Sequence, residues 1–237
     1  MRGVCRFTKY SPRKAAELVI DRARRLSTRD TEPVTKGRVE AFSDGVIAIA
    51  ITLLVLDIHV PEPRPGVSLA HRLAVQWPSY AAYVISFATI GIIWINHTAM
   101  LRRLVTVDHS VLVLNLLLLL TIGVLPFSTA LMAAYLKEPH GEKLAAAVYG
   151  GSLLLMALAF FAMQRHILSA RVHLLREHLT PEVRRALLRR NFAGVLPYAV
   201  ATAAAAINPY LTLALTAAIA VFYALPGTTG DTPPDVA

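Results

Sequence analysis

Long apolar blocks dominate the chain from residue 38 onward, and most of them are about as long as a membrane-spanning helix. An α-helix rises about 1.5 Å per residue, so about 20 apolar residues cross a hydrocarbon core of about 30 Å. The predicted spans cover residues 38–58, 77–100, 111–135, 144–163, 192–207 and 210–225. The pattern therefore predicts an all-α, polytopic membrane protein with six transmembrane helices.

Polar and helix-breaking residues mark the connections between these spans. Residues 61–66 contain three prolines and a glycine, which predict an extended connection after the first span. Pro126 predicts a kink inside the third span. The fourth span is expected to continue beyond the membrane as a basic helix toward Leu179. Thr180 followed by Pro181 predicts the start of the next helix, because Thr caps helices and Pro suits their first position.

Composition supports a membrane protein with one domain. Hydrophobic residues make up 55% of the chain and charged residues 16%, and the mean hydropathy is +0.52. Six spans with short loops use nearly all of the 237 residues, so no large extramembrane domain is expected. The predicted organisation is a basic N-terminal arm (1–37), a six-helix domain (38–225) and a disordered tail (226–237). Within the arm, residues 11–26 favour either a surface helix or, preferably, a disordered tether.

Positive charge is distributed unequally between the two sides of the predicted membrane. Of the 24 Lys and Arg, 20 lie in the arm through Arg38 or in the segments after the second and fourth spans. The positive-inside rule then predicts a multi-pass protein of the plasma membrane with both termini in the cytoplasm. The net charge of +9 suits anionic lipid headgroups as partners. Nucleic acid is not an expected partner, because the basic residues lack interleaved aromatics or a reader motif.

One face of the first span carries a stripe of small and aliphatic residues with a single hydroxyl. At 100° per residue, Gly45, Ile49, Thr52 and Leu56 fall on the same narrow face. The stripe is a candidate pore lining. Ordinary helix packing, with Thr52 bonded to the carbonyl four residues earlier, is the alternative that this pattern alone favours.

The start of the first span resembles the signature of a known channel family. The residues Arg38-x-x-x-Phe42-Ser43-Asp44 are similar to the RxxxFSD signature of the transmembrane protein 175 family of potassium channels. The following GVIAIAITLLVLDI resembles the first helix of the prokaryotic members. The runs over 86–104 and 108–132 resemble the second and third helices of that family. The resemblance covers about residues 36–225, is weaker in the last three spans, and excludes the arm.

The resemblance implies a homotetramer of single six-helix repeats in which the first helices line a central potassium pore. It places the aliphatic constriction at Ile49, a threonine layer at Thr52 and a further pore-facing position at Leu56. No TVGYG-like carbonyl filter is present in the sequence, so moderate selectivity is expected. Potassium is then the permeant ion, and no cofactor is expected.

Asp44 is a carboxylate at the edge of a membrane span and is expected to have a partner. Two interpretations stay open: a polar lock that fixes the tilt of the first helix, or a helix cap formed together with Ser43 near the free amides. The candidate partners from the sequence are Arg38, Trp94, His97 and Asn115. At the other end of the helix, Asp57 either concentrates cations at an outer mouth or is a solvated end charge, which is preferred.

Other chemistry is poorly supported by the sequence. His166, His173 and His178 are not spaced to share one helical face, so no metal site is expected. His97, Asp108 and His109 lack a nucleophile motif, so no catalytic residues are expected and the chain is not expected to be an enzyme. The lone Cys5 offers neither a disulfide nor a metal cage.

Two alternatives to a channel remain. A secondary transporter of a small solute or ion is the main one, although Pro126 is the single candidate helix break and no inverted repeat is visible. A purely structural membrane protein is the other.

Overall fold

A computed structural model describes residues 35–176 and 179–225. Predictions for the arm, for His178 and for the tail fall outside these residues. The described part of the chain is helical and has no strand, only one isolated antiparallel bridge. The longer elements are α2 (Lys36–Leu53), α4 (Trp77–Arg102), α5 (His109–Tyr135), α6 (Glu142–Arg165), α7 (Pro181–Ala193), α8 (Leu196–Ala204) and α9 (Pro209–Ala224). The short ones are η1 (Leu54–Asp57), α3 (Leu69–Val75), η2 (His166–Ala170) and η3 (Val172–Leu174).

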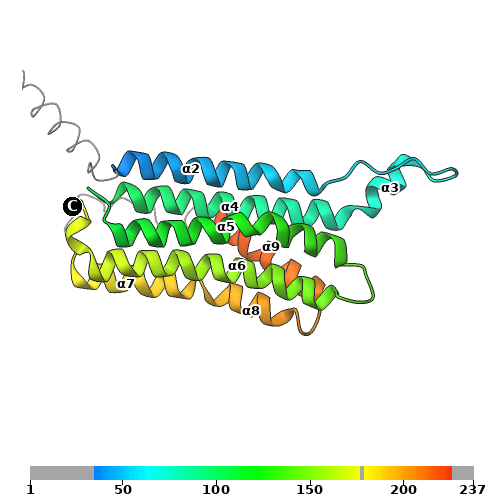
Figure 1. Cartoon of the computed structure of the whole chain (residues 1–237). Coiled ribbons are helices and arrows are strands. Elements are labelled where there is room, and N and C mark those ends of the chain that lie inside the picture. The colour runs from blue at the N-terminus through cyan, green and yellow to red at the C-terminus, as the bar shows by residue number, and fades with distance from the viewer. Residues whose placement is uncertain (1–34, 177–178, 226–237) are drawn as a thin grey trace, which may run out of the picture. The chain divides into compact units, whose positions relative to one another are not determined.

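The long helices lie side by side and run along a common axis, as Figure 1 shows. Helix α5 is central, because α2, α4 and α6 all pack against it. Its Leu118, Ile122 and Leu125 are completely buried, which follows from their spacing of three and four residues along one helical face. Helix α8 packs against α6 and α9, helix α9 packs against both α4 and α6, and α2 packs against α4 and α5 at the edge of the bundle.

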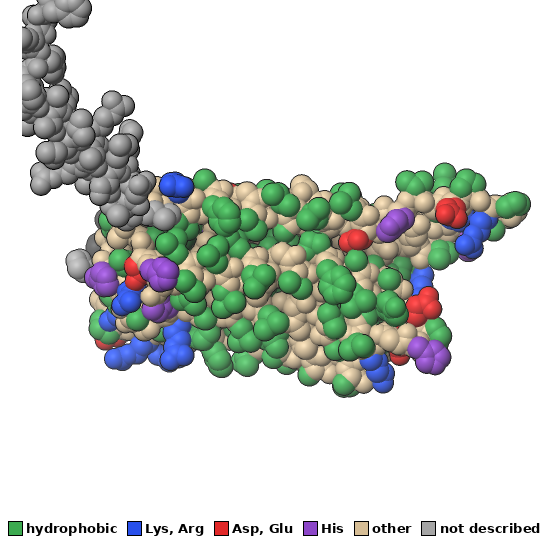
Figure 2. All heavy atoms as spheres, in the orientation of Figure 1, with side chains coloured by type: hydrophobic (Ala, Val, Ile, Leu, Met, Phe, Trp, Pro, Cys, Tyr) green, Lys and Arg blue, Asp and Glu red, His purple; other side chains and the backbone are tan. Residues whose placement is uncertain are grey.

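Length and composition confirm the membrane class. Four helices are long and apolar enough to cross a bilayer, namely 36–57, 77–102, 109–135 and 142–170, and α9 is a shorter apolar helix. Hydrophobic side chains cover the middle of the face seen in Figure 2, whereas charged side chains gather toward its ends. An all-α polytopic membrane protein is therefore confirmed.

The fifth predicted span is not one continuous helix. Helix α7 ends at Ala193 and α8 begins at Leu196, so the predicted span over 192–207 contains a break. Gly194 lies at the break, and Pro197 stands in the first turn of α8, where a residue without an N–H is tolerated. The break separates a basic helix that has no buried residue from an apolar one that packs against α6 and α9.

The expectation that the fourth span continues as a basic helix toward Leu179 is wrong. Regular α-helix ends at Arg165, and after η2 and η3 the chain pairs with the connection between α4 and α5. The Val105 N–H donates to the Leu174 carbonyl over 2.8 Å, and the Arg176 N–H donates to the Arg103 carbonyl over 2.7 Å. Burial of Leu104 and Leu174 between these segments outweighs the local helical tendency.

Other predicted boundaries are confirmed. Helix α4 begins at Trp77, and the Thr180 hydroxyl accepts a hydrogen bond from the Val183 N–H with Pro181 at the start of α7. The connection after the first span is extended and contains Gly66 with a φ of 76°. The sequence pattern did not predict α3, which Ser68 caps by accepting from the His71 N–H.

Candidate functional site

Helix α2 has one packed face. Its buried side chains are Val39, Ser43, Ile47 and Ala50, and Leu54 continues the series into η1. Their spacing of three or four residues brings them to one side of the helix, which lies against α4 and α5. This packing fixes which residues of α2 point away from the bundle.

The predicted stripe lies on the uncovered side of α2 and ends in η1, which contains Leu56. Gly45, Ile49, Thr52 and Leu56 are all exposed in the single chain, and the exposed fractions of Ile49 and Leu56 reach 60% and 67%. Large aliphatic side chains exposed in register along one helix mark a surface that meets lipid or another protein. Thr52 is the one hydroxyl within this otherwise non-polar stripe.

The Thr52 hydroxyl donates to the Ile49 carbonyl oxygen, three residues earlier, over 2.9 Å. The expected alternative was the carbonyl four residues earlier. A hydroxyl has one proton and two lone pairs, so this bond occupies the proton and leaves the oxygen able to accept. Thr52 therefore presents an oxygen ligand, rather than a donor, on the uncovered face.

A buried polar chain joins three helices behind this stripe. The Asn115 Nδ2 donates to Ser43 Oγ over 2.9 Å, and Asn115 Oδ1 lies 2.7 Å from His97 Nε2. The three side chains come from α5, α2 and α4, and each is at most 2% exposed. Hydrogen bonds among buried side chains fix relative helix positions, because breaking one leaves an unsatisfied polar group.

Asp44 is bonded to α4. Trp94 Nε1 donates to Asp44 Oδ1 over 2.8 Å, so of the four candidate partners the structure selects Trp94. The cap interpretation is wrong, because α2 begins at Lys36 and Asp44 lies in its third turn, beyond the free amides. Within the described residues Arg38 forms no ion pair with Asp44. The ion pair within α2 joins Lys36 and Glu40 over 3.5 Å.

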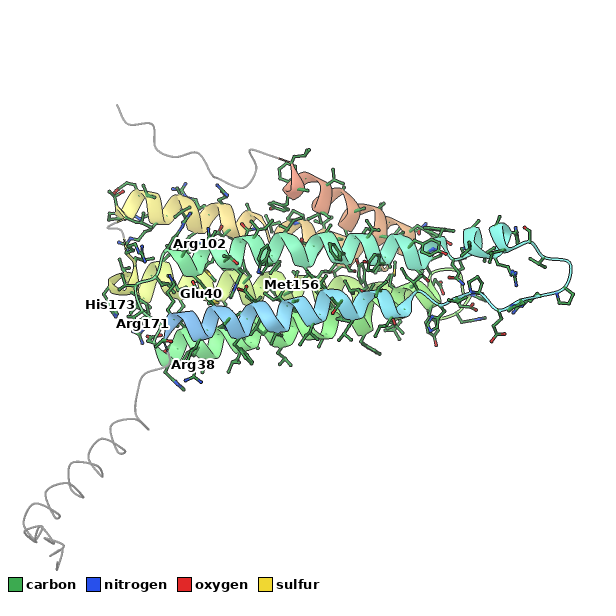
Figure 3. The ribbon with its side chains drawn as sticks, turned by 90° about the horizontal axis from the view of Figure 1, so that it is seen from above. Arg38, Glu40, Arg102, Met156, Arg171 and His173 are labelled. Carbon is green, nitrogen blue, oxygen red and sulfur yellow. The ribbon has the colours of Figure 1, made fainter. Side chains whose placement is uncertain are left out.

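The other signature residues and Asp57 do not join this polar chain. Arg38 and Phe42 are exposed at the start of α2, and the end position of Arg38 is visible in Figure 3. Asp57 ends η1 at the opposite end of the span, where its carbonyl oxygen lies 3.0 Å from His59 Nδ1. Asp57 thus lies fourteen residues after Ser43, beyond the end of α2 and away from the Ser43–Asn115–His97 chain.

The residues considered for catalysis or metal binding are not brought together. His97 contacts Asn115, whereas the Asp108 carboxylate accepts from the Val111 N–H and from Arg171. Those two bonds, the backbone one foremost, hold the pKa of Asp108 below its usual range. Within the described residues no three His, Cys, Asp or Glu side chains form a group that could hold a metal ion.

A second buried polar cluster was missed in the sequence. Ser86 Oγ lies 2.8 Å from Thr129 Oγ1 and 3.1 Å from the Tyr149 hydroxyl, which joins α4, α5 and α6. Isolated hydroxyls inside apolar blocks were the available signal. Such residues often bond their own helix, as Thr89 does here, so the signal alone does not identify partners on other helices.

Comparison with known proteins gives one consistent family. The model of the family described as "Endosomal/lysosomal potassium channel TMEM175" matches residues 38–126. A potassium channel of Streptomyces collinus is 45% identical over 187 residues, which cover 79% of this chain and 90% of the relative. A potassium channel of Chamaesiphon minutus is 39% identical over 191 residues, which cover 80% and 93%.

A solved structure agrees with the sequence relatives. The crystal structure of a lysosomal potassium-selective channel TMEM175 homolog from Chamaesiphon minutus superposes with a TM-score of 0.71 at 37% identity. The match covers 80% of this chain and 96% of that one. With a helical bundle of the same fold and relatives matched over nine-tenths of their length, the chain belongs to the TMEM175 family.

Proposed function

We propose that this chain is the subunit of a potassium-selective channel in which four copies place α2 around one central axis. The observation that carries this proposal is the uncovered stripe of α2, on a helix whose other face is fully packed. Relatives named as potassium channels support potassium as the permeant ion, and no cofactor is needed. The family consists of ion channels rather than enzymes.

The stripe supplies two kinds of pore lining in this arrangement. Each Thr52 hydroxyl proton is bonded to the Ile49 carbonyl, so the lone pairs of the oxygen are left to face the ion. Four such oxygens replace part of the water shell of a potassium ion. Rings of Ile49 and Leu56 offer no ligand and form aliphatic constrictions that close by dewetting. Selectivity is moderate, because one ring of hydroxyl oxygens provides fewer ligands than a stack of backbone carbonyls.

The signature residues position α2 rather than contact the ion. Ser43 is bonded through Asn115 to His97 of α4. The adjacent Asp44 is bonded to Trp94, which lies one turn before His97 on the same helix. Together these bonds fix the rotation and tilt of α2 against α4 and α5. Arg38 and Phe42, both exposed, lie at the end of α2 where neighbouring subunits or lipid headgroups meet the bundle.

Charge gives the orientation in the proposed assembly. Arg38, Arg102 and Arg171 lie at the same end of the bundle, as Figure 3 shows. This end faces the cytoplasm of a plasma-membrane channel and contacts anionic lipids, and both termini lie on that side. Asp57 then lies at the outer mouth, where a carboxylate raises the local cation concentration. The chain divides into a basic arm (1–37), a channel domain (38–225) and a tail (226–237).

Ion flux through the purified protein in liposomes tests the proposal. Wild type is expected to pass potassium faster than sodium. Thr52→Ala removes the oxygen ring and lowers the potassium preference several-fold, whereas Thr52→Ser keeps the hydroxyl and retains it. Ile49→Asn hydrates the constriction and gives a leakier pore.

Unchanged flux and selectivity in both Thr52→Ala and Ile49→Asn would remove these residues from the pore. A secondary transporter of a small solute or ion is the alternative, and its alternating access is far slower than channel flux. Saturating, slow flux that depends on a co-transported ion would favour that alternative.

A further inference from the structure

A cavity lies between the basic end of α4 and the segments that follow α6. Its volume is about 80 Å³, several times the ~10–15 Å³ that one water needs. Residues of α4, α6, η2 and α7 line it, on the side of α4 that faces α6 and α7. The α2 stripe contributes nothing to it, so the cavity is separate from the proposed pore.

The polar part of the lining is basic and rich in amides. Arg103 and Arg190 contribute two positive charges, and no Asp or Glu is among the lining residues. In the part of the chain that the structure describes, neither arginine has an ion-pair partner. Asn96, Gln164 and Asn191 add carboxamides, and the Gln164 Oε1 is buried without a hydrogen-bond partner. This oxygen can only accept, so an occupant has to offer it a donor, and in a phosphate site that donor is the hydroxyl of a protonated phosphate.

The walls of the cavity are held by hydrogen bonds to main-chain carbonyls. The Arg103 carbonyl accepts from the Arg176 N–H, which ties the end of α4 to the segment after η3. Arg184 of α7 donates from a guanidinium nitrogen to the Leu168 carbonyl oxygen over 3.2 Å, which fixes α7 on η2. The two free arginines therefore extend from elements whose separation is fixed.

We propose that this cavity binds the phosphate group of an anionic ligand, with Arg103 and Arg190 as its charged contacts. A guanidinium presents paired N–H donors that match two phosphate oxygens, and two guanidinium groups and three carboxamides are among the lining residues. The remaining lining is apolar and includes Met100, Ile167 and Leu187. An apolar wall beside a basic pocket suits a phospholipid headgroup at the cytoplasmic membrane surface, while a free phosphate shares the same charged chemistry.

Binding to the purified full-length protein in uncharged detergent tests the site. The probes are inorganic phosphate, short-chain phosphatidic acid and, as a lipid without net charge, short-chain phosphatidylcholine. Calorimetry is expected to show saturable binding of phosphatidic acid and not of phosphatidylcholine. Binding of phosphatidic acid alone assigns a lipid headgroup, and equal binding of inorganic phosphate assigns a free anion; either result supports the site.

Paired variants separate a specific site from general attraction between opposite charges. Arg103→Gln and Arg190→Gln are expected to weaken binding at least tenfold each. Arg189→Gln removes the same charge from the position next to Arg190, which does not line the cavity, and binding is expected to change less than twofold. Arg190→Lys keeps the charge but loses the fork, so its affinity is expected to lie between wild type and Arg190→Gln.

Helical circular dichroism and the elution volume of each variant confirm that it is folded. Absence of saturable binding to wild type by both phosphate probes overturns the proposal. Equal weakening in all three glutamine variants overturns it as well, because the effect would then report only net charge.

Discussion

Asn115 is the residue on which the positioning of α2 depends most directly. Its carboxamide bonds Ser43 of α2 and His97 of α4 at the same time. Asn115→Leu leaves both partners buried and unbonded, so the protein is expected to lose about 1–2 kcal/mol of stability. Thermal unfolding in detergent, followed by circular dichroism, measures the loss as a lower melting temperature.

A buried threonine provides the control for that variant. Thr89 is 1% exposed and its hydroxyl donates only to the Ile85 carbonyl of its own helix, so Thr89→Val removes no contact between helices. Its melting temperature is expected to fall less than that of Asn115→Leu. Equal losses would contradict a special role for the chain of side chains across α2, α4 and α5.

Features of single residues could be predicted where the signal lies within one helix, and not where it depends on packing between helices. The exposed stripe was predictable, since Gly45 to Leu56 follow helical periodicity within one element. Asp44 illustrates the opposite case: the sequence offered four partners, and only the packing of α4 beside α2 selects Trp94. The observed helix start at Lys36, eight residues before Asp44, also removed the cap interpretation.

At the scale of elements, Asp108 joins the start of α5 to the segment after α6. Its carboxylate accepts from the Val111 N–H over 2.9 Å and from Arg171. Asp108→Asn keeps a capping oxygen but loses the ion pair, whereas Asp108→Ala loses both. The alanine variant is expected to be less stable than the asparagine variant by about 1 kcal/mol at pH 7.

The stability difference between wild type and Asp108→Asn depends on pH, and the direction of this dependence can be predicted. The pKa of Asp108 is lowered in the folded protein, so its carboxylate stabilises the fold above the unfolded pKa of about 3.9. The advantage of wild type over Asp108→Asn is therefore constant between pH 7 and about pH 5. It is expected to shrink as the pH falls below about 4. Melting temperatures of both proteins across this range give the comparison, and a gap that widens in acid would contradict it.

Apolar blocks predicted the long helices but not the returns between them. The start of α4 at Trp77 and the cap of α7 at Thr180 have local signals in Pro and Thr. The reversal through η2 and η3 has none, because its partner Leu104 lies about 70 residues earlier in the chain. Local pattern alone also predicted one continuous span over 192–207, whereas the structure has two helices separated at Gly194.

At the scale of the whole molecule, a cross-link distinguishes a pore-facing stripe from a lipid-facing one. Cys5 is the only cysteine of the chain, so Cys5→Ser gives a background without thiols. Leu56 of η1 and Leu120 of α5 are 67% and 66% exposed. With a short bis-maleimide, Leu56→Cys is expected to give covalent dimers on denaturing gels, because neighbouring copies meet there in the proposed tetramer.

Leu120→Cys is the matched control and is expected to stay monomeric on the gel. Equal dimer yields at both positions would indicate random collisions, and no dimer at Leu56 would contradict a shared axis lined by α2. The family resemblance in the sequence implied this assembly, whereas hydrophobic periodicity cannot show it, because a stripe facing lipid and a stripe facing a symmetry axis have similar composition.

The uncovered face of α2 also determines how mixed populations of subunits behave. In the proposed assembly one copy supplies a quarter of the wall, yet every ion passes all four quarters in the same cross-section. One defective subunit therefore impairs the pore of a tetramer whose other three subunits are intact. Damage to the lining is consequently dominant rather than recessive in a cell that makes both forms of the chain.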